Sequence, residues 1–142
     1  MPWTLEIHHL DIKIAGDSTL IVAKNGTNVY SVLIDAGRLE SGEAVHNYIV
    51  NTAAVTQLGA MVATHYDGDH LGGLVTLLTK TDNVYGQVRV YDRGWPAGGP
   101  QGGYQAYLTA INQGPNRNRI TKPGYDVSPG DVLVQIVAGE KS

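Results

Sequence analysis

The feature that most constrains this chain is a run of four potential metal ligands within six residues, His65, Asp67, Asp69 and His70. The run directly follows the short apolar segment 59–63 and is itself followed by the glycine pair at positions 72 and 73. On an ordinary surface, two imidazoles and two carboxylates this close would repel one another or have no role. Divalent cations, in contrast, can bind all four side chains together. The pattern therefore predicts a metal site in a loop at the end of a buried strand.

Composition limits the other kinds of site. The chain has no cysteine, which excludes disulfides, thiolate zinc sites, iron–sulfur clusters and cysteine nucleophiles, so any metal must use nitrogen and oxygen ligands. With 142 residues, 42% hydrophobic and 16% charged, the chain is expected to form one globular domain over residues 1–142. No apolar run approaches the roughly 20 residues of a membrane span, and no signal segment is evident, so we expect a cytoplasmic protein with no membrane partner.

Charge distribution bears on the partner. The net charge is −3, with four basic and nine acidic side chains in residues 1–83 and six basic and four acidic ones in residues 84–142. A protein that binds duplex DNA non-specifically by charge needs a basic surplus, which is absent here. We therefore expect a small-molecule or phosphodiester substrate whose phosphate would be attracted by bound metal.

The pattern of apolar and turn residues predicts an α/β (α+β) fold. It begins with an antiparallel meander of strands at 4–13, 19–23 and 29–34, in which Asn25-Gly26 marks a hairpin turn. Helical spacing and strand patterns then alternate. We expect helices at 42–57 (with Ser41 as N-cap), 71–78 and 104–113, strands at 61–63, 87–91 and 131–137, a loop at 95–103 and a turn at 114–118.

The ligand spacing indicates hydrolytic chemistry. In an extended loop alternate side chains point the same way, so His65, Asp67 and Asp69 can converge while His70 turns to a neighbouring position. Two metal ions about 3.5–4 Å apart can orient and activate a water and stabilise both the attacking and the leaving oxygen. A helix beginning near His70 would add an anion-friendly surface through its free N–H groups.

At this point the segment resembles the metal motif of the metallo-β-lactamase fold, His-x-His-x-Asp-His followed by a pair of small residues, with Asp67 in place of the second histidine. With that replacement, the segments Leu10-Asp11-Ile12, Gly16-Asp17-Ser18 and 33–37 resemble the hydrolase domain of ComEC-like DNA-internalisation proteins and its stand-alone relatives. The resemblance covers roughly residues 5–80.

The resemblance implies an αββα sandwich and two divalent metal ions, zinc or manganese. His65 and Asp67 would serve the first metal, and Asp69 and His70 the second, with Asp69 as the catalytic metal aspartate. Asp35 would be a near-site acid beside the ligands rather than one of them. The carboxylate of Asp67 is a harder ligand than imidazole, which makes manganese or magnesium more competitive with zinc.

The same fold takes a further histidine, a bridging aspartate and a last histidine from later segments, yet residues 71–142 contain no histidine. We therefore expect this chain to be the N-terminal half of the fold, with the remaining ligands beyond Ser142. The sheet edge left in this way could drive formation of a homodimer.

The leading hypothesis is a metal-dependent hydrolase that uses a metal-activated water on a phosphodiester or nucleic-acid-type substrate. Two alternatives stay open, namely a non-catalytic metal-binding remnant or assembly module, and a hydrolase of carboxylic esters, lactones or β-lactams. Asp17 and Ser18 are interpreted as a polar turn. His8, His9 and His46 are interpreted as strand and helix-face residues rather than ligands.

Overall fold

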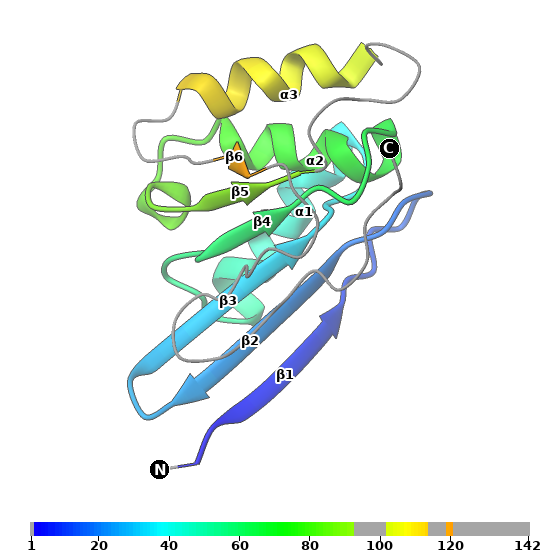
Figure 1. Ribbon diagram of the computed structural model, residues 1–142. Coiled ribbons are helices and arrows are strands. Elements are labelled where there is room, and N and C mark those ends of the chain that lie inside the picture. The colour runs from blue at the N-terminus through cyan, green and yellow to red at the C-terminus, as the bar shows by residue number, and fades with distance from the viewer. Residues whose placement is uncertain (1, 93–101, 114–118, 121–142) are drawn as a thin grey trace.

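The computed structural model describes residues 2–92, 102–113 and 119–120, which contain one six-stranded sheet whose spatial order follows the chain (Figure 1). β1 to β3 are antiparallel, and β3 to β6 are parallel. The predicted meander followed by strand–helix alternation is confirmed. The strands are β1 (Thr4–His9), β2 (Thr19–Asn25), β3 (Asn28–Ile34), β4 (Ala60–Val62), β5 (Arg89–Tyr91) and β6 (Arg119–Ile120).

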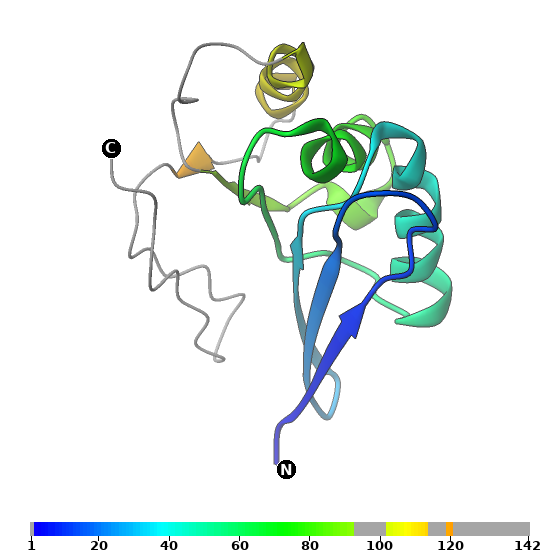
Figure 2. The same ribbon diagram turned by 90° about the vertical axis from the view of Figure 1, so that its right-hand side faces the viewer.

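The main core lies between the sheet and the helices. Figure 2 shows the cyan and green helices on the same side of the sheet. Leu33, Met61 and Val90 occupy matching positions on β3, β4 and β5, where they pack in one cluster with apolar side chains of the helices. The helical elements are η1 (Leu39–Ser41), α1 (Gly42–Asn47), η2 (Tyr48–Thr52), α2 (Gly68–Leu78), η3 (Asn83–Tyr85) and α3 (Gly102–Gln113).

The opposite face of the sheet is also apolar. Val32, Ala60 and Tyr91 form a second, smaller buried cluster there. Towards the β1 edge, Leu5 and Ile7 are 60% and 57% exposed. The described residues thus bury one face of the sheet under helices and leave apolar side chains on part of the other.

The predicted helix at 42–57 ends early. The chain is α-helical only over α1 and continues as the single wide turn η2, in which Ala53 N–H bonds to the Tyr48 carbonyl. Ala54 then has a φ of 55°, which no right-handed helix tolerates. Ser41 has helical dihedrals and makes no side-chain cap, because the preceding turn η1 leads directly into α1.

Other predicted boundaries moved by a few residues. The first strand stops at His9, α2 begins at Gly68 rather than 71, and α3 begins at Gly102, inside the expected loop 95–103. The hairpin turn is confirmed, with Gly26 at a φ of 61°. The expected strand 131–137, the turn 114–118 and residues 95–101 of the loop lie outside the described residues.

The glycine pair brings α2 against the segment that follows β3. A Cβ on Gly73 would lie 1.9 Å from the Ala36 carbonyl oxygen, and one on Gly72 would lie 2.4 Å from the Leu39 nitrogen. The close approach is fixed by the bonds Ala36 N–H to His70 O and Gly73 N–H to Gly37 O, both 3.0 Å. The start of α2 is therefore held beside the end of β3.

Among the described helices, none has the length and apolar character needed to cross a membrane.

Candidate metal centre

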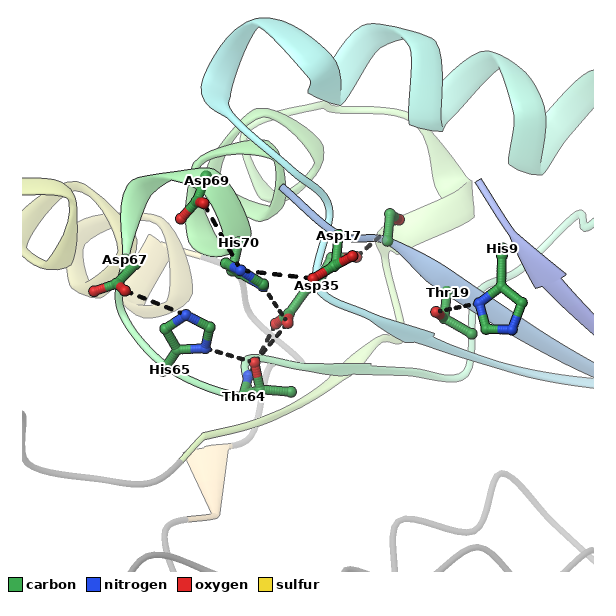
Figure 3. Close-up of polar contacts among 10 residues, drawn as sticks. His9, Asp17, Thr19, Asp35, Thr64, His65, Asp67, Asp69 and His70 are labelled. Carbon is green, nitrogen blue, oxygen red and sulfur yellow. Dashed lines mark hydrogen bonds and ion pairs between the residues drawn. The ribbon is translucent and has the colours of Figure 1, made fainter. Parts of the chain in front are cut away.

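The candidate ligands lie where two neighbouring parallel strands end (Figure 3). Asp35 directly follows β3, while the loop at 64–67 follows β4 and leads into α2. Because parallel strands point their carboxyl ends to the same edge, these two segments meet there. Asp69 and His70 occupy the first turn of α2.

The loop alternates as its extended spacing predicts. Tyr66 is buried, and its ring packs on Tyr104 and Tyr107 of α3 with centroid separations of 4.5 and 6.1 Å. His65 and Asp67, on either side of it, are partly or fully exposed. One buried tyrosine thus fixes the loop and leaves its two flanking ligands on the accessible side.

The structure brings all four predicted ligands together. His65, Asp67 and Asp69 offer ligand atoms that lie within 4.8 Å of one another, and so do Asp35, His65 and His70. The imidazole rings of His65 and His70 are 4.0 Å apart between centroids. His65 therefore belongs to both groups, which is a tighter arrangement than the two separate ligand pairs that the resemblance implied.

Asp35 is the buried acid of the site. It is 3% exposed and accepts hydrogen bonds from Thr64 N–H at 2.9 Å, from the Thr64 hydroxyl at 2.5 Å and from His70 Nδ1 at 2.9 Å. Its φ of 57° turns the chain sharply after β3, a conformation that aspartate adopts more readily than most residues. The structure thus places Asp35 beside the histidines, bonded to one of them.

Asp17 is near the site although the sequence pattern suggested only a turn. Its carboxylate lies 3.8 Å from His70 Nε2, and Ser18 donates from its hydroxyl to the Asp35 backbone carbonyl at 2.9 Å. A Cβ on Gly16 would lie 2.0 Å from the Asp69 carbonyl oxygen, so the turn packs directly on the start of α2. The proximity depends on tertiary packing between segments 53 residues apart, which local spacing does not reveal.

The donor set fits a divalent cation. His65 Nε2 lies 3.4 Å from Asp67 Oδ2, and His70 Nε2 lies 3.9 Å from Asp69 Oδ2. Bond lengths of about 2.0–2.2 Å to a metal such as zinc place neighbouring tetrahedral ligand atoms roughly 3.3–3.5 Å apart, a separation that the His65–Asp67 pair matches and the His70–Asp69 pair exceeds. An unprotonated imidazole nitrogen and a carboxylate oxygen are both acceptors, so a cation placed between them stabilises their approach. Nitrogen and oxygen donors of this kind can bind a divalent cation.

Comparisons with known proteins identify the family to which this chain belongs. Residues 13–140 match the model of the metallo-beta-lactamase superfamily. Ribonuclease Z from Methanopyrus kandleri is 28% identical over 128 residues, which are 85% of this chain and 39% of that protein. This chain thus spans well under half the length of that curated relative.

Two solved structures are similar at lower identity. A Thermotoga maritima protein assigned to the metallo-β-lactamases shares 13% identity over 87% of this chain and 61% of its own, with a TM-score of 0.46. A metallo-β-lactamase from Pseudomonas aeruginosa, solved in a mono-zinc form, shares 17% identity over 63% of this chain and 37% of its own, with a TM-score of 0.37.

The chain is therefore a member of the metallo-β-lactamase superfamily, and its α/β fold is the one expected from the sequence. It covers part of the length over which that fold extends in the two relatives described first.

Proposed function

We propose that this chain carries the first metal motif of a metal-dependent hydrolase that acts on phosphodiesters. The observation that carries the proposal is the convergence of His65, Asp67 and Asp69 within 4.8 Å, with His70 beside them. The similarity to ribonuclease Z supports a phosphodiester substrate over a carboxylic ester, lactone or β-lactam.

In this proposal His65, Asp67, Asp69 and His70 would hold up to two divalent cations, zinc or manganese. Bound cations would supply Lewis acidity, which lowers the pKa of water and stabilises charge on a phosphoryl group. Asp35 would orient His70 from the buried side through the 2.9 Å bond to Nδ1. Asp69 would be the ligand whose loss affects turnover most.

The protein environment would favour an anionic substrate only in the metal-loaded state. Asp17, Asp67 and Asp69 all place carboxylates around the two histidines, so the metal-free site repels a phosphate. The positive end of the α2 helix dipole, at the turn that carries Asp69 and His70, adds to the attraction of the metal-loaded site for an anion. Substrate affinity is therefore expected to depend on metal.

The finer assignment within the superfamily is part of this proposal. Asp67 in place of a histidine and the Gly16-Asp17-Ser18 turn support the ComEC-like branch. Gly16 packs against the Asp69 backbone, so the turn is in direct contact with the metal motif.

Metal content and hydrolysis of bis(p-nitrophenyl) phosphate test the proposal in one preparation. We expect zinc or manganese to bind and to support hydrolysis, and Asp69→Ala to abolish turnover and weaken binding of the metal. Glu40→Gln, which changes an exposed acid on η1, is the matched control and should behave as wild type.

Two results would contradict the proposal. Metal binding without hydrolysis of any phosphodiester would favour a metal-binding assembly module. Metal-dependent hydrolysis of a lactone or β-lactam, with none of the phosphodiester, would favour the other substrate class.

A further inference from the structure

The further inference concerns the protons on the two histidines of the candidate metal centre, and it rests on the function proposed above. A histidine can bind a metal only through a ring nitrogen that carries no proton, and the hydrogen bond of the other nitrogen decides which one that is. In both imidazole rings, the contacts of Thr64 and Asp35 determine which nitrogen carries the proton and which is left for a metal (Figure 3).

The Asp35 carboxylate determines which nitrogen of His70 carries the proton. Its carboxylate can only accept hydrogen bonds, and its Oδ2 atom has two close neighbours, the Thr64 hydroxyl at 2.5 Å and His70 Nδ1 at 2.9 Å. His70 must therefore carry its proton on Nδ1. Its Nε2 atom is left for a metal and faces the carboxylates of Asp17 and Asp69.

The Thr64 hydroxyl extends the same logic to His65. A hydroxyl has one proton, and here it is donated to Asp35. The remaining contact of Thr64 Oγ1, 2.9 Å from His65 Nδ1, must therefore be one in which the hydroxyl accepts. His65 then carries its proton on Nδ1 as well, and its Nε2 atom faces Asp67 at 3.4 Å.

We propose that Thr64 is a positioning residue that relays the Asp35 carboxylate to His65, so that one buried acid sets the tautomer of both histidine ligands. Thr64 itself touches neither metal nor substrate in this arrangement. Its hydroxyl occupies the space between Asp35 and the Nδ1 atom of His65, so metal is directed to the Nε2 side, where the exposed carboxylates lie. The relay therefore favours metal binding by the group of His65, Asp67 and Asp69 over binding by the group that contains Asp35.

The test compares Thr64→Val with Thr64→Ser. Valine keeps the shape of threonine and removes the hydroxyl, whereas serine keeps the hydroxyl. Thr109→Val is the matched control, because it removes an exposed hydroxyl that bonds within α3, away from the site. Melting curves identify any variant that fails to fold.

The first readout is the tautomer of His65 in metal-free protein, from long-range ¹H–¹⁵N correlation spectra. We expect the Nδ1–H form in wild type, Thr64→Ser and Thr109→Val, and a shift towards the Nε2–H form in Thr64→Val. A merely structural role for Thr64 would not move this signature. An Nε2–H form of His65 in wild type would overturn the relay.

The second readout is zinc affinity from a chelator competition titration. Partners of metal-binding histidines are typically worth 10–100-fold in affinity. We expect a loss of about that size in Thr64→Val and near-wild-type affinity in Thr64→Ser and Thr109→Val. Wild-type affinity in Thr64→Val would overturn the relay while leaving the proposed hydrolase intact. If the His65 tautomer depends on Thr64 but the wild-type protein binds no metal, the relay is upheld and the proposed function is overturned.

Discussion

At the scale of single residues, Asp35 acts on the site through the direction of its hydrogen bonds. In wild type, the Thr64 hydroxyl and His70 Nδ1 donate to the Asp35 carboxylate. In Asp35→Asn, an NH₂ group replaces one carboxylate oxygen, and because it can only donate, it cannot accept these hydrogen bonds. His70 would accept at Nδ1 and carry its proton on Nε2, the atom that we propose binds the metal. We expect the affinity for zinc to fall about 10–100-fold, as measured by competition titration.

Glu40→Gln, which changes an exposed acid on η1, is the control and should leave the affinity for zinc unchanged. Unchanged affinity in Asp35→Asn would contradict the orienting role of Asp35.

Tyr85 gives a pH-dependent prediction at the same scale. Its hydroxyl lies 2.6 Å from His46 Nδ1, and burial, followed by the carboxylates of Asp82 and Glu43, raises the pKa of this phenol. A folded-state pKa above the unfolded one adds stability that is complete below about pH 10 and is lost as pH rises beyond it.

Tyr85→Phe should therefore be less stable than wild type near neutral pH, by about 1 kcal/mol for the lost hydrogen bond. This deficit should narrow above about pH 10, because only wild type must then retain a buried phenol proton. Urea unfolding of both proteins across this range measures it, and the other titrating groups cancel in the difference. A deficit that stays constant with pH would show that Tyr85 ionises equally easily in the folded and unfolded states.

The residue scale also shows where sequence reasoning stops. The convergence of the four candidate ligands could be predicted because they lie within six consecutive residues, although Asp69 and His70 stand in the first turn of α2 and not in the extended loop. The contact of Thr64 with Asp35 and the approach of Asp17 to His70 could not be predicted, since both join segments 29 to 53 residues apart. Asp35 was placed near the site by resemblance, and its bond to His70 became visible only in three dimensions.

At the scale of elements, the close packing of α2 on the segment after β3 is what places His70 beside Asp35. Gly73→Ala would put a methyl group 1.9 Å from the Ala36 carbonyl oxygen, a backbone atom that cannot rotate away. We expect a destabilisation of about 1–3 kcal/mol or more, as for other overpacked sites. Gly68→Ala is the matched control in the same helix, because its Cβ would meet nothing within 4 Å. It should be neutral or stabilise by up to about 1 kcal/mol.

Thermal melting of the two variants checks this prediction. A Gly73→Ala protein as stable as Gly68→Ala would show that α2 can move away from β3 at little cost. Metal binding should fall with Gly73→Ala even where the fold survives, since Asp35 and His70 come from the two sides of this contact.

The elements themselves were predicted unevenly, for identifiable reasons. The hairpin carried an Asn-Gly turn signal, and α2 has leucines at helical spacing, so both were predicted. The end of α1 was not, because Ala53 and Val55 continue a helical spacing while belonging to the irregular return to β4. Both are buried there, so burial alone does not separate a helix from a packed turn.

At the scale of the whole molecule, the sheet has one face under helices and apolar residues on the other, and β1 is one of its two edge strands in the described part of the chain. The sequence predicted the α/β class because antiparallel and parallel segments differ in their turn signals and spacing. It could not predict how far each face is covered, which depends on every contact at once.

The exposed end of that second face supports our expectation of a homodimer. Leu5 and Ile7 are 60% and 57% exposed and lie on one face of β1, an edge strand of the sheet in the described part of the chain, and exposed apolar side chains on an edge strand favour association with another copy. Ile7→Lys should therefore lower the self-association constant. Val29→Lys, which adds the same charge at a 40% exposed valine on the other face of the sheet, should not. Sedimentation velocity over a range of concentrations measures both, and equal self-association of the two variants would mean that copies associate through another surface.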